Sequence, residues 1–325
     1  MRTRRTFALG ATALALVLSA CTSGGGSESP AASLAAGSST ESMAASATES
    51  MVEHPAITIG SQGFYESQLM AEIYAQALEH AGYTVTRNLG IGTRDQTAPA
   101  IENGQIDLMP EYIGSLLTFL GGTASGNSDA TFSDLQAALD PLGITALDYA
   151  PAQDQNAFVV RQETATQDSL TTMSDLAGVA TDLIWGLPPE CETNDLCSGA
   201  LSDAYGIPYG QLNVQPYGAC DAPIATALND GVIDVAELCS TQPAIAQFNF
   251  VVLTDDKQTQ PSENLAPIVR TEWLDAAPAD FADTLNAVSA AMTTDDLTAL
   301  GVEVAVQEKD VAEVATQWLT DMGML

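Results

Sequence analysis

A short motif occurs twice in this chain, and its repetition limits the folds that the chain can adopt. Residues 101–108 read Ile-Glu-Asn-Gly-Gln-Ile-Asp-Leu, and residues 228–235 read Leu-Asn-Asp-Gly-Val-Ile-Asp-Val. In each copy a glycine, which is free to take positive φ, ends a helical pattern, and a short apolar strand follows. One copy in each half of the chain predicts two similar lobes that face each other.

The first copy continues into Met-Pro-Glu-Tyr-Ile-Gly-Ser at residues 109–115. Because Pro110 has no backbone donor, we expect it to stop the pairing of this strand. Glu111, Tyr112 and Ser115 would then lie just beyond the end of the strand. Ligands bind at this edge in open α/β sheets, so these three residues are candidate binding residues.

Apolar periodicity around the first copy alternates between strands and helices. Strands are predicted at residues 56–61, 83–89 and 106–109, and helices at residues 68–80 and 97–103. This β-α-β-α-β order favours a mostly parallel sheet. We expect residues 54–153 plus 254–325 to form lobe one and residues 154–253 to form lobe two, so that the chain crosses a hinge twice.

The charge of the chain restricts its partners. Nine Lys and Arg stand against 42 Asp and Glu, which gives a formal net charge of −33. A nucleic-acid partner is excluded, because binding phosphates requires a basic face. A solvated acidic surface is the simple explanation of this charge, and attraction of a cationic ligand is the alternative.

The first 53 residues have the composition of an export signal and a tether. Residues 1–20 combine an Arg-rich start with an apolar run that is too short to span a bilayer comfortably. The run ends in Leu-Ser-Ala-Cys, which resembles a bacterial lipobox, so we expect Cys21 to carry a lipid. An ordinary secretory signal is the alternative, and the paired arginines also resemble a twin-arginine signal. Residues 21–53 are rich in Gly, Ser, Ala and Thr and predict a flexible, lipid-anchored tether outside the cytoplasm.

The remaining four cysteines are Cys191, Cys197, Cys220 and Cys239. An even number in an exported protein predicts two disulfides. Three pairings are possible, and the short spacing favours Cys191 with Cys197, which leaves Cys220 with Cys239. Zinc is the alternative, but the chain has no Cys-x-x-Cys spacing and only two histidines, so we expect no metal and no cofactor.

Two stretches of the chain together resemble a known family. They are Gly-Ser-x-x-Phe-x-Glu-Ser-Gln at residues 60–68 and Pro-Glu-Tyr-x-Gly-Ser at residues 110–115. They resemble the substrate-binding proteins of glycine betaine, carnitine and choline ABC importers, and the likeness extends over residues 56–320. The resemblance implies an α/β fold, the two-lobed periplasmic-binding-protein clamp of type II, with two hinge crossovers. It also implies an aromatic cage that holds a trimethylammonium group by cation–π attraction.

The resemblance assigns roles to individual positions. Tyr112 matches a cage tyrosine, Ser115 a neighbouring hydroxyl, Phe158 lies near a second aromatic position, and Gln62 stands where the family often has Lys. Two positions depart from the cage, since Cys239 and Glu263 stand where aromatic residues are expected. The candidate ligand-binding residues are Gln62, Phe64, Glu111, Tyr112, Ser115, Asn156, Phe158, Thr241, Glu263 and Asn264.

The family usually clamps the ligand carboxylate with an arginine, and no such arginine is evident in this sequence. Asn194 lies near its expected position. A cage with few aromatic rings binds a quaternary ammonium less well, and without the arginine a ligand carboxylate lacks its bidentate partner. Glu263 or Glu111 could instead pair with a primary or secondary ammonium.

The resemblance implies a solute-binding lipoprotein of an ABC importer that captures a small cationic or zwitterionic osmolyte between two lobes. Its partners would be the permease and ATPase subunits, together with the cell membrane through Cys21. The alternatives are a sensor lipoprotein without a role in transport, or a receptor for a different small amine. An enzyme is not expected, because the sequence has no Gly-x-Ser-x-Gly motif and neither histidine lies beside a candidate serine.

Overall fold

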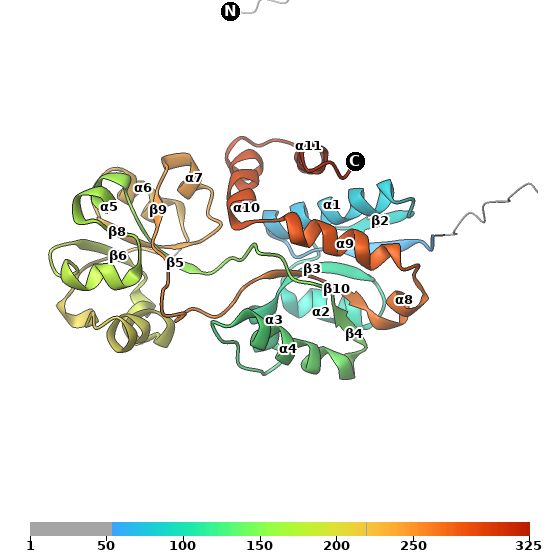
Figure 1. Cartoon of the computed structure of the whole chain (residues 1–325), viewed down its shortest axis with the longest axis horizontal. Helices are drawn as coiled ribbons and strands as arrows, with labels where there is room; N and C mark the ends of the chain where they lie inside the picture. Colours follow the sequence, from blue (N-terminus) through green and yellow to red (C-terminus); the bar gives the residue numbers. More distant parts are fainter. Residues whose placement is uncertain (1–53, 219) are drawn as a thin grey trace, which may run out of the picture. The chain divides into compact units, whose positions relative to one another are not determined.

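A computed structural model describes residues 54–218 and 220–325, which form one compact unit with two five-stranded sheets (Figure 1). The predicted signal peptide, Cys21 and the tether lie outside the described residues. None of the described helices combines the length and the apolar character that crossing a membrane requires.

The sheet of the first lobe has the strand order β2-β1-β3-β10-β4. Its strands are β1 (Ile57–Gly60), β2 (Val85–Asn88), β3 (Leu108–Tyr112), β4 (Ile144–Ala146) and β10 (Leu265–Arg270). Its helices are α1 (Tyr65–His80), α2 (Arg94–Glu102), α3 (Ile113–Phe119), α4 (Ser128–Leu139), α8 (Thr271–Ala276), α9 (Asp280–Ala291), α10 (Thr294–Gly301) and α11 (Val311–Asp321). Alternate residues of β3 face opposite sides of the sheet, so Leu108 packs with α1 and α9 while Met109 packs with α3 and α4.

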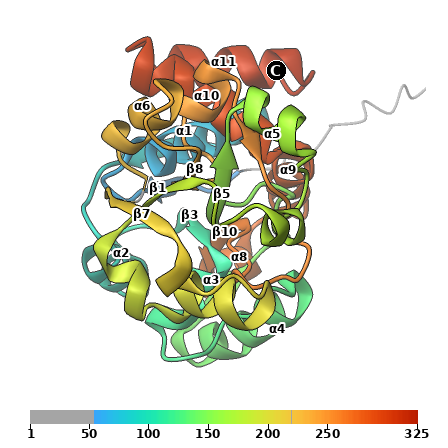
Figure 2. The same ribbon diagram turned by 90° about the vertical axis from the view of Figure 1, so that its left-hand side faces the viewer.

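The sheet of the second lobe has the order β7-β6-β8-β5-β9 and lies in front in Figure 2. Its strands are β5 (Asn156–Val160), β6 (Ile184–Leu187), β7 (Asn213–Pro216), β8 (Val235–Cys239) and β9 (Val251–Val252). Its helices are α5 (Gln162–Asp168), α6 (Ala222–Asn229), α7 (Ala244–Phe248) and the π-helix η4 (Asp195–Ala204), and the 3₁₀-helix η3 (Pro189–Thr193) precedes η4.

The two sheets have the same topology. In each, three strands run parallel, and a strand from elsewhere in the chain pairs antiparallel with the third. This strand is β10 in the first lobe and β5 in the second. The two segments that connect the lobes also contact each other, because Asp154 N donates to Glu263 O at 3.0 Å and Gln155 Nε2 donates to Pro261 O at 2.7 Å. The predicted two-lobed α/β clamp is confirmed.

The structure explains why the repeated motif contains an aspartate. Asp107 lies at the start of β3, where its carboxylate accepts a hydrogen bond of 2.9 Å from Thr58 N in β1. On its other side it forms an ion pair with Arg270 at the end of β10, with 3.2 Å between Nε and Oδ1. A single carboxylate therefore joins three neighbouring strands. Gly104, at φ +70°, turns the chain immediately before it.

The second copy repeats these contacts in the second lobe. Asp234 accepts from Ile184 N in β6 at 3.0 Å and pairs with Arg161, which follows β5, at 2.9 Å. Gly231 has φ +71°. In both lobes the motif therefore fixes the end of the sheet opposite the strand end that carries Tyr112 or Cys239.

Pro110 does not stop the pairing of its strand, and the expectation that it would was wrong. It lies directly opposite Pro267 in the antiparallel ladder between β3 and β10. Hydrogen-bonded and non-hydrogen-bonded pairs alternate in such a ladder, and Ile113 N donates to Asn264 O three positions away. The two prolines therefore form a non-hydrogen-bonded pair, in which neither residue needs a donor.

We predict that Asp107→Ala lowers the free energy of unfolding by about 2 kcal/mol, because it leaves Arg270 and the Thr58 amide without their partner. Urea denaturation followed by circular dichroism measures the change. Asp182→Ala removes an exposed carboxylate from the other lobe and serves as the control. Equal stability of the two variants would contradict a structural role for the aspartate of the motif.

Candidate functional site

A cavity of about 400 Å³ lies between the two lobes. Six of the ten residues predicted from the sequence line it, namely Gln62, Phe64, Tyr112, Ser115, Asn156 and Glu263. Six further lining residues were not predicted: Arg94, Asp154, Gln155, Leu196, Gln260 and Pro261. Both lobes and both connecting segments contribute to the wall, so a molecule bound here would contact every part that moves when the lobes open or close.

The other four predicted residues do not line this cavity. Phe158 is buried in the second lobe, where its ring lies 6.0 Å from that of Trp185, and it borders a second cavity of about 360 Å³. Asn264 is buried and structural, because its amide donates to Ala150 O at 2.9 Å. Thr241 lies in a crevice that adjoins the first cavity. Glu111 is buried behind the wall.

Two aromatic rings lie side by side in the cavity. Phe64 immediately precedes α1 and Tyr112 ends β3, and their ring centroids are 6.4 Å apart with an angle of 23° between the planes. The ring of Phe64 is free to contact a ligand, since 42% of the residue is exposed. The hydroxyl of Tyr112 donates a hydrogen bond to Glu66 Oε1, and this contact fixes the ring. The pair presents the kind of aromatic surface that attracts an organic cation.

An arginine that the sequence analysis did not single out lines the cavity. Arg94 extends from the start of α2 and grips the Glu111 carboxylate in a fork, with Nη2–Oε2 and Nε–Oε1 distances of 2.8 and 3.0 Å. Gln62 Nε2 also donates to Glu111 Oε1 at 3.1 Å. Burial raises the pKa of Glu111, and Arg94 opposes this shift by stabilising the charged form. The guanidinium is therefore already neutralised by a partner in its own lobe.

The position of Arg94 in the sequence could have indicated that a carboxylate lies near it. A basic residue in the first turn of a helix opposes the helix dipole, so it needs a carboxylate nearby to compensate. Asn194, which stands near the expected arginine, instead caps η4, because its side-chain oxygen accepts from Leu196 N at 2.8 Å.

Two more carboxylates face the cavity. Glu263 accepts two hydrogen bonds of 2.9 Å from Ser115, one from the backbone N and one from Oγ. Asp154 accepts from Thr241 N at 3.3 Å. Burial raises the pKa of both carboxyls, while their hydrogen bonds oppose the shift. Since Arg94 is balanced by Glu111, these two carboxylates leave the cavity with an excess of negative charge.

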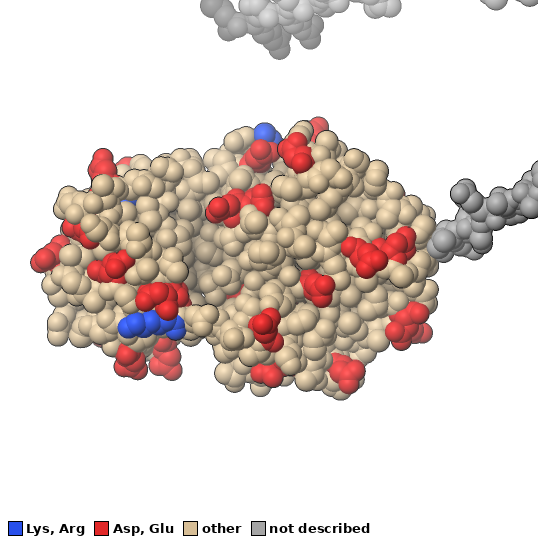
Figure 3. Space-filling view, viewed as in Figure 1, with Lys and Arg blue, Asp and Glu red and all other residues tan. Residues whose placement is uncertain are grey.

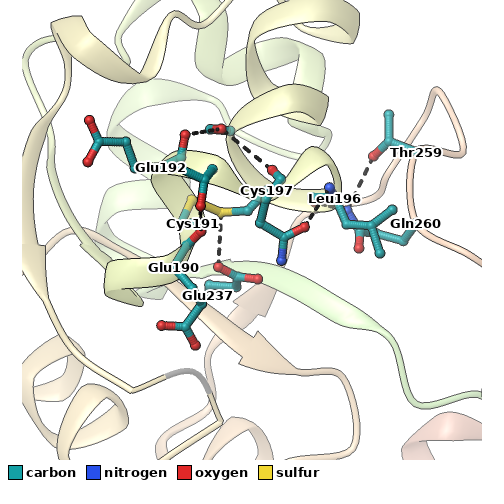
Figure 4. The surroundings of a disulfide bond; sticks show 11 residues. Glu190, Cys191, Glu192, Leu196, Cys197, Glu237, Thr259 and Gln260 are labelled. Atoms are coloured by element: carbon teal, nitrogen blue, oxygen red, sulfur yellow. Dashed lines mark hydrogen bonds between the residues drawn. A yellow bond between two sulfur atoms is a disulfide. The ribbon is translucent and has the colours of Figure 1, made fainter.

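A disulfide holds the wall that the second lobe contributes. Cys191 in η3 is bonded to Cys197 in η4, and Leu196 beside it lines the cavity (Figure 4). Gln260 Nε2, from the second connecting segment, donates to Leu196 O at 2.7 Å. The disulfide therefore helps to position Leu196, whose carbonyl oxygen also contacts the second connecting segment.

The same disulfide lies beside a buried carboxyl. Glu237 Oε2 is 3.1 Å from Cys197 Sγ (Figure 4). Burial, followed by the charge of Glu190, raises the pKa of Glu237 to about 7. A disulfide sulfur has no proton, so the protonated form of Glu237 donates in this contact. Cys191, Cys197 and Glu237 are close enough to hold a metal, but sulfurs joined to each other are not thiolate ligands.

The second disulfide joins Cys220 to Cys239, so the pairing favoured by the sequence is confirmed. Cys239 ends β8 just as Tyr112 ends β3, and each is paired with the antiparallel strand of its own sheet. The second lobe therefore presents a disulfide at the position where the first lobe presents an aromatic ring.

Carboxylates also dominate the outer surface. On the face shown in Figure 3, acidic side chains are spread over both lobes, and basic side chains occur in only a few places. Such a surface attracts cations over long distances and repels anions. The surface and the cavity thus favour the same sign of ligand charge.

Comparison with known proteins gives consistent matches over most of the chain. The family model of the substrate binding domain of ABC-type glycine betaine transport systems matches residues 55–321. A glycine-betaine-binding protein from Pseudomonas aeruginosa is 25% identical over 279 residues, which are 83% of this chain and 88% of that protein.

Two solved structures are similar over the same part of the chain. One is described as a glycine betaine/carnitine/choline ABC transporter; it is 25% identical with a TM-score of 0.76 and covers 82% of this chain and 99% of that chain. The other is the apo form of YehZ from Escherichia coli, 25% identical with a TM-score of 0.75, covering 83% of this chain and 99% of that chain.

We predict that both disulfides stabilise the fold, and that the stabilisation depends on the length of the closed loop. Replacing Cys191 and Cys197 together by alanine should lower the free energy of unfolding by about 2 kcal/mol, and replacing Cys220 and Cys239 by about 3 kcal/mol. Each double variant is the control for the other in urea denaturation. A larger loss from the shorter loop would show that packing around Glu237, and not loop closure, determines the effect.

Proposed function

Since this chain belongs to the family of substrate-binding domains of ABC-type glycine betaine transport systems, we propose that it captures a small organic cation or zwitterion of the glycine betaine and choline class between its two lobes. The observation that carries this proposal is the cavity between the lobes, where the rings of Phe64 and Tyr112 lie beside the carboxylates of Glu263 and Asp154. The similar protein from Pseudomonas aeruginosa is named for glycine betaine, and a further relative from Listeria monocytogenes is named for carnitine transport.

The chemistry of the ligand explains the need for this environment. A quaternary ammonium has no N–H group and cannot donate hydrogen bonds. It is therefore held by the faces of aromatic rings and by electrostatic attraction to nearby negative charge. The rings of Phe64 and Tyr112 supply the first, and the excess carboxylate charge of the cavity supplies the second. Burial strengthens this attraction, because the effective dielectric constant is lower than in water.

We further propose that the cavity prefers a cation with an uncharged polar end over a zwitterion with a carboxylate. The fork of Arg94 is occupied by Glu111, and a ligand carboxylate would have to compete for it. Ser115 and Asn156 instead offer neutral polar groups in the same wall. The hydroxyl of choline suits these neutral partners better than the carboxylate of a zwitterion does.

Transport follows from the family, whose members are substrate-binding components of importers and act with permease and ATPase subunits. For this chain we propose lobe one at residues 54–153 plus 254–325 and lobe two at 154–253, with closure around the ligand creating the surface that the permease recognises. We also propose export by residues 1–20 and a lipid anchor on Cys21 that keeps the protein outside the cytoplasm, at the bacterial cell membrane. A sensor that binds the same solute without transport is the alternative, and loss of solute uptake on deletion of the gene distinguishes the two.

Isothermal titration of the full chain tests the ligand class. We predict that choline, glycine betaine or carnitine binds, and that Phe64→Ala weakens binding by about tenfold, because one ring contributes up to about 2 kcal/mol to holding the cation. Phe119→Ala is a matched control: Phe119 lies in the same lobe outside the cavity and is 43% exposed, against 42% for Phe64. Equal effects of the two substitutions, or no heat with any of the three solutes, would contradict the proposal.

The preference for an uncharged polar end has its own test. Glu111→Gln keeps the shape of the side chain but removes the charge that neutralises Arg94, so the affinity for glycine betaine should rise relative to choline. We expect the ratio of the two affinities to change by about tenfold, the usual effect of one charge-assisted hydrogen bond. Melting temperatures show whether the variant is folded. An unchanged ratio would mean that Arg94 does not act on the ligand.

A further inference from the structure

A second, smaller opening adjoins the cavity at Phe64. It has a volume of about 190 Å³, and Phe64 and Asp154 line both spaces. Glu66, at the start of α1, lines it from the first lobe, and Thr241 and Gln242, which follow β8, line it from the second lobe. We call this space the Glu66 crevice. None of the residues that line it is basic.

Two buried side-chain oxygens in the Glu66 crevice make no hydrogen bond among the described residues, although the Thr241 hydroxyl lies near enough to Glu66 to oppose the rise of its pKa. They are Glu66 Oε2 and Gln242 Oε1. Glu66 is only 3% exposed, and its other oxygen accepts from the Tyr112 hydroxyl. Because an unpaired buried polar atom is costly, each such atom calls for an explanation, and a donor from outside the chain is one that fits two oxygens lining the same opening.

We propose that the Glu66 crevice is a subsite for an ammonium group that carries N–H donors. The chain would then bind primary, secondary or tertiary ammonium compounds in addition to quaternary ones. This inference rests on the proposed function, since the crevice is an extension of the cleft between the lobes.

The arrangement of acceptors distinguishes the two kinds of nitrogen. An N–H ammonium can donate charge-assisted hydrogen bonds to Glu66 Oε2 and Gln242 Oε1, with the carboxylate of Asp154 nearby. A trimethylammonium group cannot donate, so in the crevice it would leave both acceptors unpaired. It is better held on the ring faces of Phe64 and Tyr112 in the larger cavity.

The crevice also joins the two lobes. Glu66 belongs to the first lobe and Gln242 to the second, so an ammonium group that binds both would link them and favour closure. A ligand that makes contacts with both lobes in the closed form alone shifts the equilibrium toward that form. Binding in the crevice would therefore act in the same direction as binding in the main cavity.

The protonation of Glu66 gives a second readout. Burial, followed by the charge of Asp154, raises the pKa of Glu66 to about 8, while Thr241 opposes the shift. The other groups that face it are the hydroxyl of Tyr65, whose pKa burial raises, and the hydroxyl of Tyr112, which donates to Glu66 Oε1. At neutral pH the carboxyl is mostly protonated, and a bound ammonium would displace the proton. Affinity for an N–H ammonium should therefore rise with pH, by up to about tenfold per unit below the pKa.

The experiment uses ligands that differ only in methylation of the nitrogen. The full chain is titrated calorimetrically with ethanolamine, dimethylaminoethanol and choline, between about pH 6 and pH 8. Glu66→Gln removes the charge but still accepts from Tyr112, and Gln242→Met removes the second acceptor from a partly exposed position. Glu163→Gln, on the exposed face of α5, is the matched control.

We expect ethanolamine and dimethylaminoethanol to bind to the unmodified chain with affinity that rises with pH. Glu66→Gln should lower both affinities by about tenfold or more and abolish the pH dependence, whereas Gln242→Met should lower both affinities and change the affinity for choline by less than about threefold. Glu163→Gln should have no effect. Because Gln242 is partly exposed, its substitution keeps the test valid even if Glu66→Gln fails to fold.

The possible failures are distinct. If choline binds but the N–H compounds do not, or if they bind equally well to the unmodified chain and both variants, the subsite is refuted and the proposed function stands. If only the N–H compounds bind, and do so through Glu66, the subsite is supported and the quaternary ligand class is refuted. If none of these compounds binds, and neither betaine nor carnitine does, both proposals are refuted.

Discussion

Each lobe depends on one carboxylate that joins three strands. Asp107 accepts from the backbone of β1 and pairs with the arginine that ends β10, and Asp234 does the same for β6 and the arginine that follows β5. These contacts lie at the end of the sheet away from the cleft. With that end fixed, the opposite ends of β3 and β8 hold Tyr112 and Cys239 at defined positions beside the space between the lobes. The binding cleft is thus built from two equivalent frames, whose rims carry different side chains.

The difference between the rims sets the character of the site. The first lobe supplies the ring of Tyr112, with Phe64 beside it, whereas the second lobe supplies a disulfide and the wall around Leu196. Carboxylates from the connecting segments, Asp154 and Glu263, add negative charge where a further ring is absent. A cation bound there would meet fewer ring faces and more negative charge than in a cage made of aromatic residues alone.

Local patterns in the sequence were sufficient to predict much of this fold. The repeated Gly-x-Ile-Asp motif predicted two similar lobes, because its glycine and aspartate act within a few residues of the strand that they start. The resemblance to the betaine and choline importers, the α/β clamp and the cysteine pairing are confirmed.

Long-range partners were not predictable. Pro110 is tolerated because it stands in a non-hydrogen-bonded pair with a residue of β10, far away in the chain. The charge of Arg94 is compensated by Glu111, which lies on another element. Glu111 itself, adjacent to Tyr112 in sequence, is buried behind the wall, where Arg94 and Gln62 donate to its carboxylate.

The ion pair between Arg94 and Glu111 has a consequence for the release of cargo. A receptor whose arginine is paired only by the ligand must leave a bare cation behind when the ligand departs, and this cost slows dissociation. Here the arginine has an internal counter-ion, with 2.8 Å between Arg94 Nη2 and Glu111 Oε2. The arginine of the cavity is therefore not left unpaired when the cleft is empty, and the excess charge that remains there is the negative charge of Asp154 and Glu263. Release of the solute from such a receptor does not require an arginine to lose its partner.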